Sequence, residues 1–184
     1  GMTAEVLFEA MRYGCLSVEE VRSEDDLGRF GMGMKSASLS QCRCLTVVSY
    51  EGQKLTGFTW DYNHNLKTQD WMIKELDTRE ICNLPYISKL KEQKNGTLVI
   101  WQDFDVLSNS SGGQVYSTLV DLRSLLESSL ALIYHRFLSG IGTSRLHIFI
   151  NELDIKPLDP FLELQPKTTA KKEIELDIKD TKGI

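Results

Sequence analysis

The sequence predicts an α+β fold, a two-layer α/β sandwich whose mixed, mostly antiparallel sheet is covered by helices on one face. Three observations indicate it: residues 44–62 have the pattern of a β-hairpin, residues 96–104 that of a buried strand, and residues 119–137 carry apolar side chains at helical spacing. The 184 residues suffice for one well-buried core, or for one domain with an appendage.

The first elements are a short helix and a polar connection. Residues 3–13 place apolar side chains at helical spacing, with Thr3 as the expected N-cap and Gly14 as the expected stop. Residues 15–27 are polar and acidic, and this composition predicts a mobile connection.

The central part of the chain is rich in β-forming residues. The stretches CLTVVSY and KLTGFTWDY are separated by EGQ, which predicts a hairpin with a glycine-containing turn. DWMIKEL predicts another strand, and ISKLKEQK predicts a short helix ended by Asn95 and Gly96. GTLVIWQDF is the strongest candidate for a buried strand.

The last third begins with a long helix. Its apolar residues form a stripe that is expected to face the core, and Gly140 and Gly142 are expected to end the helix. The stripe consists of Leu119, Leu122, Leu126, Leu130, Ile133 and Phe137. RLHIFIN alternates like a strand, the proline-containing KPLDPFLELQP is expected to be irregular, and KEIELDIKD predicts a final strand.

Composition excludes several classes of protein. A hydrophobic content of 41% and a charged content of 26% are typical of soluble globular proteins. The net charge of −5 does not support direct nucleic-acid binding. No apolar run approaches the ~20 residues of a membrane span and no signal peptide is visible, so a cytoplasmic protein is expected. The four cysteines follow no metal or disulfide spacing, and no metal site is predicted.

Residues 28–41, GRFGMGMKSASLSQ, could hold a phosphate group. Met34 separates Gly33 from Lys35, which excludes a P-loop, and Ser36 stands where a dinucleotide fingerprint requires glycine. The downstream motifs of protein kinases are missing. Glycines would still let backbone amides approach an anion, with Lys35 supplying positive charge. A glycine-rich turn before a packed helix explains the spacing equally well.

The same stretch resembles the lid motif of the GHKL superfamily, which includes gyrase B, histidine kinases, ninety-kilodalton heat-shock chaperones and MutL, and it is most similar to MORC-like bacterial members. GMTAEVLFEAMRYG resembles the segment after that family's D-x-G-x-G nucleotide box, and NGTLVIW resembles its late box. IYHRFLSG and LHIFINELDIKPLDPF resemble a helix, a strand and an Asp-Pro-Phe turn of bacterial members. Four motifs in the right order cover nearly the whole chain.

The resemblance implies a GHKL (Bergerat-type) fold in which ATP and Mg²⁺ are bound under a glycine-rich lid. The positions that it assigns to the nucleotide are Met2, Gly28, Arg29, Phe30, Gly31, Met32, Gly33, Met34, Lys35 and Thr97. Backbone amides of the run would meet the phosphates, Lys35 would offset their charge, and Met2 and Thr97 would hold the adenine. Taken alone, Thr97 is better explained as an ordinary strand residue. No catalytic or metal-binding residue is assigned.

One departure from the family pattern shapes the functional expectation. Family members carry, before the segment that begins this sequence, a catalytic glutamate, a Mg²⁺-binding asparagine and an adenine-binding aspartate. We therefore expect residues 1–155 to be a partial ATP-binding domain without its first helix and strand. Residues 156–184 are expected to be an irregular connection and a strand leading toward a following domain.

The expected function is that of an ATP-binding domain acting as a nucleotide-driven conformational switch. On its own, this chain is expected to bind ATP feebly or not at all and not to hydrolyse it. An uncovered sheet edge would favour a homodimer or other self-association. The alternative is a non-catalytic protein-interaction module that retains the ATPase fold.

Overall fold

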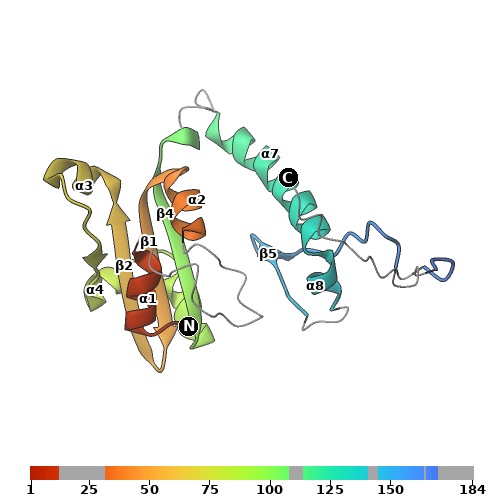
Figure 1. The fold of residues 1–184 in the computed structure, drawn as a ribbon, viewed down its shortest axis with the longest axis horizontal. Coiled ribbons are helices and arrows are strands. Elements are labelled where there is room, and N and C mark those ends of the chain that lie inside the picture. The colour runs from red at the N-terminus through yellow and green to blue at the C-terminus, as the bar shows by residue number, and fades with distance from the viewer. Residues whose placement is uncertain (13–31, 108–113, 141–144, 164, 170–184) are drawn as a thin grey trace, which may run out of the picture. The chain divides into compact units, whose positions relative to one another are not determined.

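The computed structural model describes residues 1–12, 32–107, 114–140, 145–163 and 165–169 (Figure 1). The chain divides into two compact units, Gly1–Val115 and Tyr116–Ile184. Several sequence predictions lie outside the described residues: the stops at Gly14 and Gly142, the connection 15–27 and the final strand. The predicted domain boundary after residue 155 stays a prediction.

Unit 1 is built on a four-stranded sheet, in agreement with the predicted α+β class. The sheet order is β3-β2-β1-β4, and every neighbouring pair is antiparallel. The strands are β1 (Cys42–Glu51), β2 (Lys54–Asp61), β3 (Lys74–Glu75) and β4 (Gly96–Phe104). The strand predicted from DWMIKEL is therefore limited to two residues.

The predicted hairpin of β1 and β2 is confirmed. Glu51 pairs with Lys54, and the two residues between them, Gly52 and Gln53, both have positive φ, of 54° and 66°. Two left-handed residues in a two-residue loop follow the right-handed twist of the strands. On its other edge β1 pairs with β4, so that Val47 lies between Phe58 and Val99.

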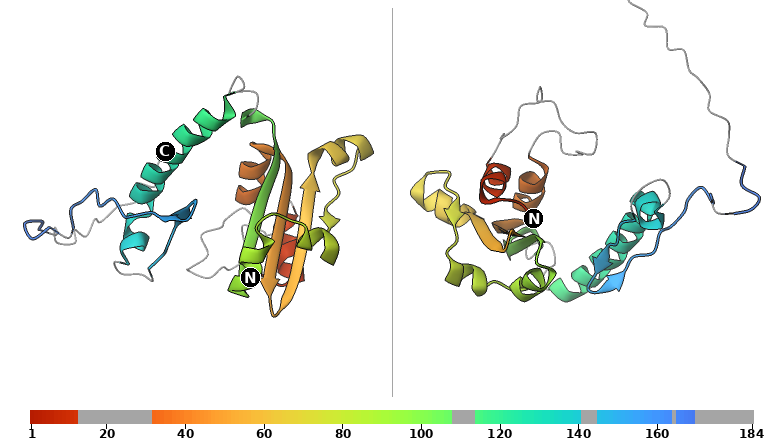
Figure 2. Two further views of the ribbon diagram at one scale, coloured as in Figure 1. Left: turned by 180° about the vertical axis from the view of Figure 1, so that it is seen from behind. Right: turned by 90° about the horizontal axis from the view of Figure 1, so that it is seen from below.

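Two helices cover one face of the sheet, here called the α1/α2 face. They are α1 (Ala4–Met11), capped by the Thr3 hydroxyl as predicted, and α2 (Gly33–Leu39). Figure 2 shows both on the same side of the strands. Their buried contacts with the sheet form one cluster: Leu7, Met11, Leu45, Val47, Phe58 and Trp60.

The opposite face of the sheet carries a second, smaller cluster. Val48 alternates with Val47 along β1 and therefore points away from α1. It packs with Ile81, Ile87 and Leu90. The helices that supply them are α4 (Thr78–Cys82) and α5 (Ile87–Gln93), the second of which confirms the helix predicted before Asn95. Helix α3 (Tyr62–Thr68) directly follows β2 and is capped by the Asp61 carboxylate.

Strand β4 forms where it was predicted, but the prediction that it is buried is wrong. Ile100 is its only buried residue, whereas 45% of Val99 and 39% of Trp101 are exposed. The reason is its position: among the described strands, β4 lies at the edge of the sheet and has β1 as its one neighbour. The continuous apolar run that predicted a buried strand therefore belongs to a strand at the edge of the described sheet.

Unit 2 contains α7 from Tyr116 onward, two short strands and a second short helix. Its elements are α7 (Val115–Ile133), α8 (His135–Ser139), β5 (Phe149–Ile150) and β6 (Leu153–Asp154). The helix predicted over 119–137 is thus interrupted at Tyr134, and Gly140, with φ of 72°, ends α8 as predicted. β5 is much shorter than the predicted RLHIFIN strand, and the following segment is irregular as predicted.

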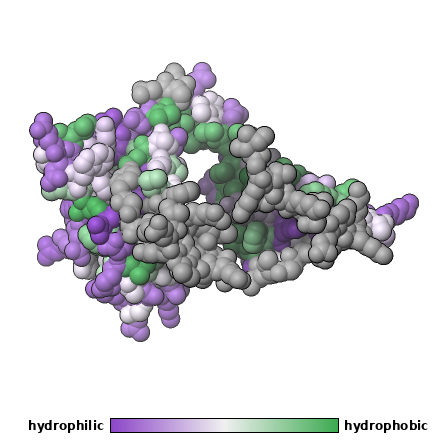
Figure 3. All heavy atoms as spheres, in the orientation of Figure 1, coloured by the Kyte–Doolittle hydropathy of each residue, from purple (hydrophilic) through white to green (hydrophobic). Residues whose placement is uncertain are grey.

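Most of the apolar stripe of the long helix does not face a core in the described residues. Only Ala131 of α7 is buried, in a cluster with Leu138 and Ile155. About half of the surface of Leu119, Leu122 and Leu126 is exposed. Of the stripe residues, Leu130 packs on this cluster. Most of the stripe lacks a core because the described part of unit 2 places against α7 only α8, the short hairpin of β5 and β6, and the segment that begins at Ile155. Hydrophobic residues accordingly appear among hydrophilic ones on the molecular surface (Figure 3).

Candidate functional site

The predicted nucleotide-binding residues fall into two groups. Gly28, Arg29, Phe30 and Gly31 lie outside the described residues. The others belong to unit 1: Met2, Met32, Gly33, Met34, Lys35 and Thr97. The described ones can be placed by their contacts, beginning with the pair that is farthest apart in the sequence.

Met2 and Thr97 meet at the same residue, Ser49 of β1. The backbone N–H of Met2 donates to Ser49 Oγ at 2.6 Å, and Thr97 is the cross-strand partner of Ser49 on β4. Ser49 Oγ in turn donates to the carbonyl of Gly96 at 3.4 Å. The N-terminal segment, the central strand and the start of β4 are thus joined by one hydroxyl group. The Met2 side chain packs on the buried cluster of the α1/α2 face, while Thr97 is exposed.

Sequence reasoning missed Ser49. It is fully buried, with an exposed fraction of 0%. A serine between apolar strand residues is a weak signal, because both faces of this sheet carry apolar clusters and alternation alone could not assign it to either. Its partners are 47 residues away on each side, so only the strand pairing identifies it.

Met32, Gly33 and Met34 mark the start of α2. Met32 occupies the N-cap position without a side-chain cap and is 44% exposed, whereas Met34 packs on the buried cluster. A Cβ atom built on Gly33 would meet no heavy atom within 4 Å. Packing among the described residues therefore does not require glycine there, and none of them fills the space beside its backbone.

Lys35 is held inside the protein. It is 1% exposed, and its Nζ donates to the carbonyls of Ala10 at 2.7 Å and Arg12 at 2.5 Å. Next to these bonds, the Trp60 indole Nε1 donates to the Met11 carbonyl at 2.9 Å. In this arrangement the ammonium group is directed at the end of α1. The predicted contact of Lys35 with a phosphate stays a prediction.

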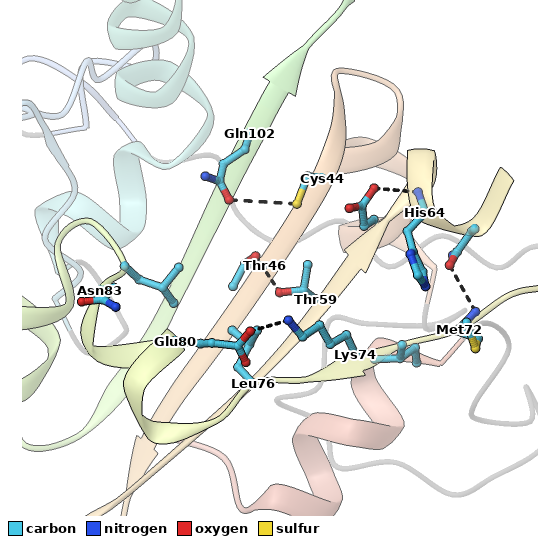
Figure 4. A pocket seen from close by; sticks show the side chains of 14 residues that line it. Cys44, Thr46, Thr59, His64, Met72, Lys74, Leu76, Glu80, Asn83 and Gln102 are labelled. Carbon is cyan, nitrogen blue, oxygen red and sulfur yellow. Dashed lines mark hydrogen bonds and ion pairs between the residues drawn. The ribbon is translucent and has the colours of Figure 1, made fainter. Parts of the chain in front are cut away.

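A pocket of about 810 Å³ lies on the opposite face of the sheet (Figure 4). The hydroxyls of Thr46 and Thr59 are hydrogen-bonded at 2.8 Å between β1 and β2. Cys44 Sγ lies 4.0 Å from Gln102 Oε1, and its thiol pKa is raised by burial and, secondarily, by the Asp61 carboxylate. A pocket of this size can hold a small ligand, but it contains none of the predicted nucleotide-binding residues.

An exposed ion pair stands at this pocket. Lys74 Nζ donates to Glu80 Oε1, and this bond lowers the pKa of Glu80 and raises that of Lys74. Glu80 also accepts a hydrogen bond from the backbone N–H of Asp77, completing a capping box at the start of α4. The pair thus fixes a helix start.

Neither region has the composition of a metal centre. Within the ranges that the structure describes, no three histidine, cysteine or carboxylate side chains gather closely enough to hold an ion. The α1/α2 face presents backbone amides, a hydroxyl, methionines and a buried ammonium group. These groups can bind a ligand, but none of them is a general base. None of the helices in the described ranges combines the length and apolar character needed to span a bilayer.

The chain was compared with known proteins. A family model described as histidine kinase-, DNA gyrase B-, and HSP90-like ATPase matches residues 1–97. None of the curated proteins is a match. The matched range runs from the N-terminus to the second residue of β4, and it contains all ten predicted nucleotide-binding positions.

Proposed function

Because the chain belongs to the family of histidine kinase-, DNA gyrase B- and HSP90-like ATPases, we propose that unit 1 binds ATP, weakly on its own, on the α1/α2 face of its sheet. The observation that carries the proposal is the junction at Ser49. There the Met2 amide donates to Ser49, and Thr97, the last residue of the family match, is the cross-strand partner of the same serine. Two positions 95 residues apart, assigned to adenine by separate motifs, thereby share one neighbour.

The nucleotide would extend from this junction toward the start of α2. Met2 and Thr97 would hold the adenine, and backbone amides of Gly28, Gly31 and Gly33 would meet the phosphates, with Arg29, Phe30, Met32 and Met34 around them. The space beside Gly33, which none of the described residues fills, supports this assignment, because close approach of a ligand to the backbone is a reason to use glycine. We place the chain nearest the MORC-like members on the stretch GRFGMGMKSASLSQ.

The chain would act by binding rather than by chemistry. Activation of a water molecule requires a positioned base, and the candidate residues include no carboxylate or histidine. Mg²⁺ prefers carboxylate, carbonyl and water oxygens, so the same residues do not supply a magnesium site by themselves. We therefore propose that nucleotide binding to these residues changes conformation, and that hydrolysis is not performed by them.

A second function is favoured by one observation, the exposed edge of β4. Among the described strands β4 has a single neighbour, and it presents Val99 and Trp101 to solvent. Such an edge can pair with a strand from another chain. The alternative proposal is a protein-interaction module that keeps the ATPase fold and associates with itself or with a partner through β4.

Calorimetry with Mg·ATP and with ADP distinguishes the two functions. The key variant is Gly33→Ala, whose Cβ would meet none of the described residues but would meet a bound phosphate. Gly33 is the first residue of α2, so its replacement by alanine should stabilise the fold by at most about 0.5–1 kcal/mol, the value for a helix interior. The variant should nevertheless bind nucleotide about tenfold more weakly. Ser36→Ala, an exposed change on the same helix, is the matched control and should bind like the original chain.

Failure of the folded chain to bind either nucleotide would refute the ATP proposal for this chain. Light scattering after gel filtration would then test the alternative. A concentration-dependent dimer that is disrupted by Val99→Lys would support pairing through β4. A monomer at all concentrations would count against self-association.

A further inference from the structure

The end of α1 is capped by side chains from two other elements. The last carbonyls of a helix have no partner within the helix. Here the Lys35 side chain of α2 donates to the carbonyls of Ala10 and Arg12. The Trp60 indole of β2 donates to the Met11 carbonyl, which lies between them. Three successive carbonyls are therefore bound from outside the helix by two side chains that are themselves buried.

The position of the Lys35 ammonium group is unfavourable for a phosphate. The C-terminal end of a helix carries partial negative charge, which attracts a cation and repels an anion. A lysine directed at this end compensates the exposed carbonyl dipoles. To contact a phosphate, the same group would have to give up both carbonyl bonds and move away from the helix end.

We propose that Lys35 is a positioning residue and not a phosphate ligand. Its ammonium group ties Arg12, the last described residue after α1, to the first turn of α2. These are the two ends between which the sequence runs through residues 13–31, so Lys35 fixes the separation at which the chain leaves α1 and enters α2. Only its effect on nucleotide binding rests on the proposed function. The tie itself follows from the two hydrogen bonds and the burial.

The first test uses the indole protons of the chain. In Lys35→Met the carbonyls on either side of Met11 lose their hydrogen bonds to the ammonium group. The end of α1 that holds the Trp60 indole should then open more often, and exchange of the indole proton with solvent should accelerate about tenfold. The indole of Trp101, which donates to Ser38 Oγ of α2 at 2.9 Å, reports whether α2 stays docked and should not change. Lys67→Met, which replaces an exposed lysine of α3, is the matched control. Unchanged Trp60 exchange in Lys35→Met would overturn the proposal.

The unaltered chain provides a measurement that does not depend on a variant folding. A buried ammonium group that donates to two carbonyls exchanges its protons slowly. The Lys35 side-chain signal should therefore be visible in ammonium-selective NMR and should persist when ADP is added. An ammonium group that exchanges freely with solvent, or that shifts strongly with ADP, would overturn the proposal.

Adenosine and ADP separate the two roles of Lys35. A positioning residue affects the site as a whole, so Lys35→Met should weaken both ligands by the same factor. A phosphate ligand would weaken ADP about tenfold more than adenosine, and that result would overturn the proposal. If the original chain binds neither ligand, the proposed function fails, while the Trp60 and ammonium measurements still decide the role of Lys35.

Discussion

Ser49→Ala is the change that tests the junction of the candidate site most directly. The Ser49 hydroxyl accepts from the Met2 amide at 2.6 Å and donates to the Gly96 carbonyl at 3.4 Å, and the residue is fully buried. Alanine fits the same space but offers neither bond. The Met2 N–H is then left without its acceptor in a partly buried position.

The expected loss of stability follows from these two bonds. The bond from Ser49 to the Gly96 carbonyl is long and contributes little. The cost is therefore mainly the lost bond from the Met2 amide and the desolvation of that unpaired amide. A net hydrogen bond contributes about 0.5–1.5 kcal/mol, and a buried unsatisfied group costs about 1–3 kcal/mol. We expect a loss of about 1–3 kcal/mol in the free energy of unfolding. For a unit of this size that corresponds to a melting temperature lower by roughly 4–12 °C.

Thermal unfolding followed by tryptophan fluorescence measures this loss, because all three tryptophans of the sequence lie in unit 1. Ser36→Ala, an exposed serine replaced in the same way, should leave the melting temperature nearly unchanged. Equal melting temperatures for the two variants would refute the reasoning, since the buried hydroxyl would then contribute no more than an exposed one. A nucleotide-binding defect larger in Ser49→Ala than in Ser36→Ala would connect the junction to the site.

Two further predictions concern the opposite face of the sheet. Gly57→Ala should lower the free energy of unfolding, measured in urea, by about 1–3 kcal/mol. A Cβ there would lie 3.2–3.3 Å from the apolar side chains of Val48, Leu76 and Ile81. An unchanged urea midpoint would contradict this packing. The pKa of Glu80 is lowered, chiefly by Lys74, so the stabilisation from this pair is present above the ordinary glutamate value and is lost as the pH falls through the lowered one. NMR titration should show the Glu80 pKa returning toward its ordinary value in Lys74→Met, and an unchanged value would mean that the ion pair does not form in solution.

The elements that the sequence predicted well are those determined by neighbouring residues. The hairpin turn at Gly52 needs only two residues of positive φ, and the start of α1 needs only the Thr3 hydroxyl. The burial of β4 and of the long apolar stripe could not be predicted in the same way, because burial depends on which elements pack on them. An apolar run does not carry that information.

The candidate site shows the same division. Glycine spacing and the family resemblance assigned Met2, Gly33 and Thr97 to the nucleotide, and this assignment stays a prediction. The contacts of Ser49 and Lys35 were not predictable, because their partners are 47 and 23–25 residues away. A lysine after a glycine run was interpreted by its charge, whereas the fold directs that charge at a helix end.

The alternation along β1 constrains how this protein can change during evolution. Ser49 serves the junction on one face, and its neighbour Val48 serves the apolar cluster on the other. Inserting or deleting one residue in the strand would exchange the two faces, placing valine where a hydroxyl is needed and serine among apolar side chains. Single substitutions therefore leave the two faces of β1 in register, whereas insertions and deletions are tolerated only in the turns at its ends.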